Sequence, residues 1–194
     1  EYLDGGNSNN ALILAHGRGK NPRWDVVQPL RIGIHKALGY HTLSLQMPND
    51  DIYWKLYADD FPKAYTIIKE GIQFLREEKG VETIYLMGHS MGGRMVSAFM
   101  ANNPQTTVNG LIVAGCLNNG DYPLSCFRNL KKVTIPVLDI WGGGENKDSL
   151  AAFKRKILLS NKYQQLEIPN ANHRFSGYGD ELVSAVVKWL KAQH

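Results

Sequence analysis

The stretch TIYLMGHSMGGRMVSAFMA, residues 83–101, joins an apolar run, a glycine-rich turn and a helical pattern in direct succession. The run TIYLM is typical of a buried strand, and the pattern after the turn predicts a helix that ends before Pro104. In the turn, Gly88, Ser90 and Gly92 fit the pattern G-x-S-x-G. Such a turn has no room for side chains two residues before and after the serine, and its strained backbone projects the hydroxyl above the sheet. The motif alone is weak, but this context predicts that Ser90 is a nucleophile rather than an idle serine in a tight turn.

Short apolar runs alternate with longer helical patterns along the whole chain. We expect strands over residues 11–15, 41–45, 83–87, 108–114, 133–141 and 165–168, and helices over residues 25–38, 61–79, 91–102, 150–159 and 181–192. This alternation predicts an α/β fold in one domain, residues 1–194: a doubly wound, mostly parallel sheet of about six strands with helices on both faces. In such sheets, functional sites form at the carboxyl ends of the strands.

The composition is that of a globular protein, and it narrows the possible functions. The 194 residues are 43% hydrophobic and 21% charged, with a net charge of +4 and a pI of about 9.0. The longest basic cluster, residues 128–132, holds three charges, which favours a solvated surface over a nucleic-acid-binding patch. No apolar run approaches the roughly 20 residues that cross a bilayer. No zinc-ligand spacing or phosphate-binding loop occurs, so we expect no metal and no cofactor.

Three motifs follow one another at the ends of expected strands. They are LILAHGRG at residues 12–19, GHSMGG at residues 88–93 and IPVLDIWG at residues 135–142. With these motifs the chain resembles the α/β-hydrolase superfamily over essentially its whole length, and it looks most similar to small bacterial serine hydrolases with HGRG and GHSMGG motifs. The resemblance implies a catalytic triad in the chain order serine, acid, histidine.

The loop HGRG, residues 16–19, follows the first core strand, where this architecture places its oxyanion loop. We expect the backbone N–H groups of Arg18 and Met91 to donate to the oxygen of the tetrahedral intermediate. Both donors matter, because losing one typically lowers the rate by about 10²–10³-fold. Gly17 lets the backbone approach the substrate closely. His16 is expected to hold backbone groups of the loop. The alternative for this segment is a plain turn.

The acid of the triad is expected in the turn after the strand that contains IPVLDIWG. Family members usually place the acid three residues past a glycine, and Gly142 plus three is Glu145. Glu145 is therefore the first candidate, although aspartate is commoner there. Asp148 is the rival, with the alternative role of a helix N-terminal acid. Asp139 lies inside the expected strand and cannot easily reach the site.

The base of the triad is expected to be His173, which follows the last expected strand and precedes the closing helix. There it could take the proton of Ser90 and return it to the leaving group, oriented by the acid at its other nitrogen. Its alternative role is that of a histidine in a surface loop. The other histidines are less suitable: His89 should pack beneath the turn, and His35 and His41 flank the second expected strand, away from the site. His194 is the terminal residue.

These residues predict a serine hydrolase that cleaves small carboxylic esters through an acyl-enzyme. A thioesterase or peptidase could use the same residues, and a non-catalytic binding protein on the same fold is a further alternative. About 20 residues separate the strands over 108–114 and 133–141, which is too few for a cap with its own core. We therefore expect an open site and a small-molecule substrate.

Loops must then form the rim of the site, from residues 21–24 and 48–54. Trp24, Tyr53 and Trp54 could supply apolar walls, although each could equally pack on the body of the fold. Four cations near these loops favour an anionic substrate; they are Arg18, Lys20, Arg23 and Arg174.

Cys116 and Cys126 lie ten positions apart in one expected loop. They could form a disulfide in an oxidising compartment or remain two thiols in the cytosol. We favour the disulfide, and with it a periplasmic or secreted location over a cytoplasmic one.

Overall fold

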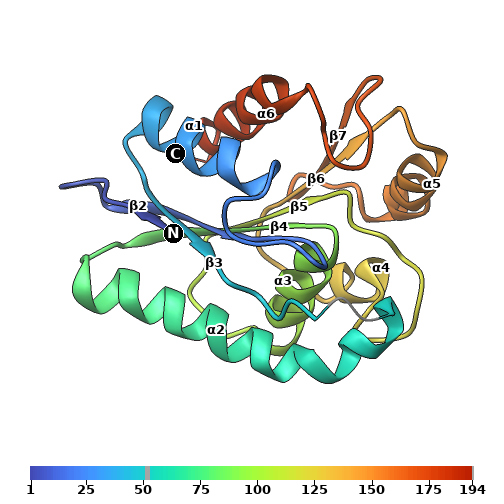
Figure 1. The fold of residues 1–194 in the computed structure, drawn as a ribbon, viewed down its shortest axis with the longest axis horizontal. Coiled ribbons are helices and arrows are strands. Elements are labelled where there is room, and N and C mark those ends of the chain that lie inside the picture. Colours follow the sequence, from blue (N-terminus) through green and yellow to red (C-terminus); the bar gives the residue numbers. More distant parts are fainter. Residues whose placement is uncertain (51–52, 194) are drawn as a thin grey trace.

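The computed structural model describes residues 1–50 and 53–193, in which a seven-stranded sheet lies between two layers of helices (Figure 1). The strands are β1 Tyr2–Leu3, β2 Asn10–Ala15, β3 His41–Leu45, β4 Thr83–His89, β5 Gly110–Ala114, β6 Val137–Gly142 and β7 Tyr163–Ile168. Their order is β1-β3-β2-β4-β5-β6-β7, and all neighbours are parallel except β1 and β3. The expected doubly wound, mostly parallel sheet is confirmed, with β1 as an additional edge strand.

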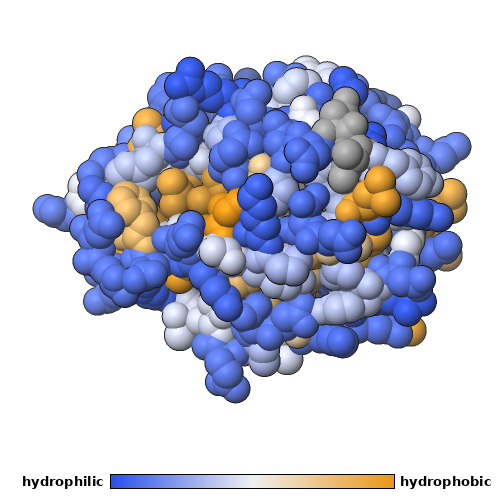
Figure 2. Space-filling model, turned by 60° about the horizontal axis from the view of Figure 1, so that its bottom comes forward, coloured by the Kyte–Doolittle hydropathy of each residue, from blue (hydrophilic) through white to orange (hydrophobic). Residues whose placement is uncertain are grey.

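Helices cover both faces of this sheet. They are α1 Val27–Leu38, α2 Phe61–Gln73, α3 Met91–Asn102, α4 Cys126–Leu130, α5 Asn146–Arg155 and α6 Gly179–Lys191, with short helical turns η1 Trp54–Asp60, η2 Phe74–Glu78 and η3 Lys156–Leu158. No helix in the described part of the chain is long and apolar enough to cross a bilayer. The face shown in Figure 2 is mostly hydrophilic, with apolar residues confined to a few patches.

The alternating side chains of the strands divide the core into two buried layers. In β2, Leu12 and Leu14 pack in the layer that contains buried residues of α1 and α6. Ile13 points the other way, into the layer that contains α2 and α3. Continuous burial of β2 on both faces explains its unbroken apolar sequence, since a parallel strand covered by helices needs no polar side. β4 lies in the middle of the sheet, between β2 and β5.

Several expected elements begin or end elsewhere. The helix over 61–79 is α2, which continues as the π-helical turn η2. The strand over 133–141 begins only at Val137, because Pro136 has no N–H to donate to a neighbouring strand. The helix over 150–159 starts earlier, as α5 at Asn146. Three short elements were not expected from the sequence: β1, η1 and α4.

A buried ion pair fixes the sheet to α5. Asp139 of β6 and Arg155 of α5 are both fully buried, and the Nε and Nη2 atoms of the arginine each lie 2.8 Å from the carboxylate. Arg155 Nη1 also donates to the carbonyl of Cys116 at 2.6 Å. Asp139 therefore has a structural role inside the sheet, in agreement with its expected distance from the site.

Cys116 and Cys126 form a disulfide, as the sequence predicts, with their Cα atoms 6.0 Å apart. The bond connects the segment just after β5 to the first residue of α4. Within the described chain, α4 is the only helix between β5 and β6, and it has five residues. No cap domain is inserted between β5 and β6 in this described part of the chain.

We expect the double replacement of Cys116 and Cys126 by serine to lower the free energy of unfolding by about 2–3 kcal/mol, because the bond closes a loop of about ten residues in the unfolded chain. Urea unfolding of the wild type and the double variant measures this difference. Thiol counting in denaturant should find no free thiol in wild-type protein made in an oxidising compartment. Two free thiols there would contradict the disulfide.

Candidate active site

The turn between β4 and α3 places Ser90 at the carboxyl edge of the sheet. Its backbone has a φ of 54° and a ψ of −114°, a left-handed conformation that is strained for serine. A Cβ atom at Gly88 would meet the carbonyl of Gly92, and one at Gly92 would meet the carbonyl of Ala15, both at less than 3.0 Å. The turn therefore requires both glycines, as the sequence predicts.

A chain of hydrogen bonds connects Ser90, His173 and Asp148. Ser90 Oγ lies 2.9 Å from His173 Nε2, and the other ring nitrogen, Nδ1, lies 2.8 and 3.0 Å from the two carboxylate oxygens of Asp148. Asp148 is 1% exposed. Because an ionised carboxylate only accepts hydrogen bonds, the histidine donates through Nδ1. Its Nε2 atom then accepts a hydrogen bond from the hydroxyl of Ser90.

The structure does not bring Glu145, the first candidate for the acid, to the ring of His173; its rival Asp148 lies at that ring instead. Glu145 instead accepts a hydrogen bond from the backbone N–H of His173 at 2.9 Å and pairs with Lys147 at 2.8 Å. The bond with Lys147, followed by the backbone bond, lowers the pKa of Glu145.

The reason lies in the turn after β6. The backbone N–H groups of Gly143 and Gly144 donate to the carbonyls of Ile168 and Ala171, at 3.0 and 2.9 Å. These bonds hold the turn against the segment that leads to His173. Glu145 is thereby fixed beside the backbone of that segment, at the N-cap of α5, and the first turn of α5 carries Asp148 to the ring.

Two other histidines, His89 and His16, form hydrogen bonds with backbone groups next to the site. His89 is buried and donates through Nε2 to the carbonyl of His173 at 2.8 Å. Burial, together with the neighbouring His173, lowers the pKa of His89 to about 3, so it is neutral at physiological pH. His16 donates through Nδ1 to the carbonyl of Gly17 at 2.8 Å. Its Nε2 atom accepts a hydrogen bond from the backbone N–H of Met47 at 3.0 Å. Both match their expected structural roles.

The loop that contains Gly17 and Arg18 approaches Ser90 closely. A Cβ atom at Gly17 would lie 3.3 Å from the Cβ of Ser90, which leaves little room for any residue but glycine. Met91 is the first residue of α3, and N–H groups in the first turn of a helix have no partner within the helix. The two expected donor residues, Arg18 and Met91, line the same cavity as Ser90.

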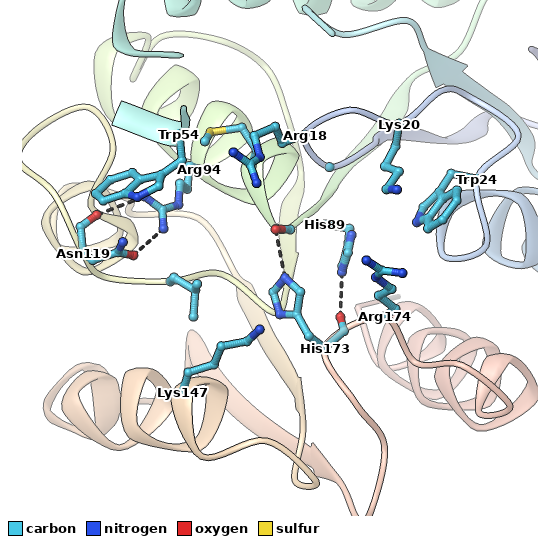
Figure 3. A pocket seen from close by; sticks show the side chains of 14 residues that line it. Arg18, Lys20, Trp24, Trp54, His89, Arg94, Asn119, Lys147, His173 and Arg174 are labelled. Atoms are coloured by element: carbon cyan, nitrogen blue, oxygen red, sulfur yellow. Dashed lines mark hydrogen bonds between the residues drawn. The ribbon is translucent and has the colours of Figure 1, made fainter. Parts of the chain in front are cut away.

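A cavity of about 390 Å³ opens above Ser90 (Figure 3). Of the residues expected to bind substrate, Gly17, Trp24 and Trp54 line it. Tyr53 does not: it is 57% exposed, and its ring lies beside that of Trp54, with centroids 5.8 Å apart. Trp54 begins η1 and turns inward, whereas Tyr53 precedes that helical turn and faces solvent.

The cations of the cavity differ in part from those expected. Arg18, Lys20 and Arg174 line it, but Arg23 points away and pairs with Glu1 at 2.8 Å. Four lining residues were not singled out from the sequence; they are Arg94, Leu117, Asn119 and Lys147. Arg94 follows Ser90 by four residues, so helical spacing could have indicated that it lies on the side of α3 near Ser90.

Comparisons with solved structures agree with this fold. Est1E from Butyrivibrio proteoclasticus is 17% identical, with a TM-score of 0.77 over 97% of this chain and 89% of that one. A dienelactone hydrolase from Anabaena variabilis is 19% identical, with a TM-score of 0.76 over 95% and 87%. XC6422 from Xanthomonas campestris, described as a serine hydrolase without lid, is 17% identical, with a TM-score of 0.70 over 94% and 83%.

Comparison with curated protein sequences gave no match. The model of the alpha/beta hydrolase family, in contrast, matches residues 38–183, which is most of the chain and includes Ser90, Asp148 and His173. The chain belongs to the α/β hydrolase family.

Proposed function

We propose that this protein is a serine hydrolase that cleaves small carboxylic esters through an acyl-enzyme on Ser90. The observation that carries the proposal is the position of His173, between Ser90 at 2.9 Å and the buried Asp148 at 2.8 Å. Such an arrangement lets a neutral imidazole remove a hydroxyl proton while the carboxylate stabilises the imidazolium that forms. Dienelactone hydrolase and lipolytic enzymes among the fold neighbours are in keeping with an ester substrate.

In the first half of the reaction, Ser90 Oγ attacks the ester carbonyl and His173 Nε2 takes the hydroxyl proton. The backbone N–H groups of Arg18 and Met91 donate to the negative oxygen of the tetrahedral intermediate. His173 then gives its proton to the departing alkoxide, which leaves as the alcohol. The acyl group remains on Ser90.

In the second half, a water molecule enters from the open cavity and loses a proton to His173 as it attacks the acyl carbonyl. Collapse of the second intermediate returns the proton to Ser90 and releases the carboxylic acid. The Cys116–Cys126 disulfide supports an oxidising, periplasmic or extracellular location for this activity.

A series of substrates that differ only in the scissile bond tests which bond the protein cleaves. Purified wild type and Ser90→Ala are assayed on an ester, a thioester and an anilide with the same acyl group. The proposal expects turnover of the ester above that of the other two, and its loss in the variant. A faster thioester or anilide would assign a different bond, and no turnover of any member would favour a binding protein on this fold.

The absence of a cap between β5 and β6 predicts activity without a lipid interface. We expect a soluble short-chain ester to be hydrolysed with ordinary saturation kinetics, because the described loops leave the cavity over Ser90 open. The rate is measured across the solubility limit of the substrate. A sharp rise only above that limit would contradict the open site.

A further inference from the structure

Arg94 is a buried cation in the wall of the cavity. It lies in the first turn of α3, one turn after Ser90, and it is 4% exposed. Burial lowers the pKa of its guanidinium to about 10, so it still carries its charge at neutral pH. A buried charge is costly unless a partner of opposite charge compensates it.

The partners of Arg94 are neutral. Its Nη1 atom donates to the carbonyl of Asn119 at 3.0 Å, and Nη2 donates to the side-chain oxygen of the same residue. The guanidinium also lies over the ring of Trp54, 5.1 Å from its centroid. Among the described residues no carboxylate lies within ion-pair distance of Arg94.

The chain itself provides a comparison. Arg155 is a second buried arginine, and Asp139 accepts two 2.8 Å hydrogen bonds from it. Arg94 has no such partner and, in addition, occupies the first turn of a helix, where the macrodipole favours anions over cations. Burial and helix position therefore both leave Arg94 with an uncompensated positive charge.

The other charged residues that line the cavity are also positive. Five cationic residues line it, and no aspartate or glutamate of the described chain does. Figure 3 shows Arg94 and Trp54 on one side of His173, with Lys20, Trp24 and Arg174 on the other. Apart from Arg94, these cations are on the rim, where water screens them. Arg94 is the one held inside.

We propose that Arg94 binds the carboxylate of an anionic ester whose scissile carbonyl lies at Ser90. This inference rests on the proposed function and names its substrate class: esters that carry a second, free carboxylate. A guanidinium offers paired donors that match a carboxylate, and Asn119 and Trp54 hold it in place. Trp54 and Leu117 provide apolar wall for the carbons between the two groups.

The test uses two pairs of substrates that differ only in charge. In the first pair, mono-4-nitrophenyl adipate is compared with 4-nitrophenyl adipamate, in which a neutral amide replaces the free carboxylate. This pair carries the charge on the acyl half of the ester. 4-Acetoxybenzoate against 4-acetoxybenzamide places it on the alcohol half. Spontaneous hydrolysis is subtracted with Ser90→Ala. We expect wild type to prefer the anionic member of one pair by about 10- to 100-fold in kcat/KM, the range for a charged hydrogen bond.

Variants then assign the preference to Arg94. In Arg94→Met the ratio of anionic to neutral kcat/KM should fall to about one, and Arg94→Lys should recover part of it. Arg128→Met removes an exposed charge that pairs with Asp121, and it should keep the wild-type ratio. A purely structural role for Arg94 would lower both members of a pair together and leave the ratio unchanged.

The outcomes separate the two proposals. If neither member of either pair is hydrolysed, the proposed function fails. If the neutral esters are hydrolysed as well as the anionic ones by wild type, the function stands and the anionic subsite is overturned, whether or not the Arg94 variants fold. An equal loss of preference in Lys147→Met would attribute it to the general charge of the rim and overturn the role of Arg94.

Discussion

Replacing either Ser90 or His173 with alanine is expected to lower kcat by about 10⁴- to 10⁶-fold. In the proposed mechanism the serine supplies the attacking oxygen, and the histidine, 2.9 Å away, accepts its proton. Because each is useless without the other, the double variant should be little worse than either single variant. Initial rates on a soluble ester, with active protein quantified beforehand, measure these losses.

Folding has to be separated from chemistry in these variants. Ser90→Ala removes only a hydroxyl at a half-buried position, so its free energy of unfolding should stay close to that of wild type. Clearly additive losses in the double variant would show that the two residues act independently. Normal turnover in either single variant would exclude the proposed acyl-enzyme.

The second large effect concerns the acid. Asp148→Asn is expected to lower kcat by about 10⁴-fold, because an amide cannot stabilise the imidazolium and favours the wrong tautomer of His173. Glu145→Gln should cost less than about tenfold, since the amide oxygen can still accept the backbone N–H of His173. Both replacements keep the size of the side chain, so the comparison is matched.

The reverse order of the two effects would transfer the role to Glu145. Equal, small effects would mean that His173 needs no carboxylate partner. The comparison is made in kcat at saturating ester, with the free energy of unfolding of each variant as the control for loss of structure.

The sequence could indicate Ser90 because its geometry is local. A strand, two obligatory glycines and a helix start lie within a few residues of one another, and nothing distant is needed to form the turn. His173 could be found for a related reason: it follows the last strand of the sheet, and the carboxyl ends of parallel strands share one edge.

Asp148 could not be distinguished from Glu145 in this way. The choice depends on how the glycines after β6 bond to the backbone around Ala171 and on where α5 begins. The glycine bonds join segments that are far apart in the chain, and they help to set where α5 begins. Counting residues from a glycine does not capture such contacts. Glycine-plus-three counting therefore gave the residue at the N-cap of α5 instead of the one in its first turn.

Arg94 was missed for a further reason. The residues after Ser90 predict a helix with one buried, apolar face. An arginine in such a helix is expected on the opposite, exposed face. Its burial in the cavity requires Trp54 from η1 and Asn119 from the disulfide-closed loop, which the sequence does not place together. The two-residue strand β1 escaped prediction because it is too short to have a pattern of its own.

The central claim is that Ser90 is the nucleophile activated by His173. A fluorophosphonate probe followed by intact-protein mass measurement and peptide mapping tests this claim without knowledge of the substrate. We predict one adduct per chain, located on Ser90, absent in Ser90→Ala and formed far more slowly in His173→Ala. No adduct on the folded wild-type protein, or an adduct on another serine, would contradict it.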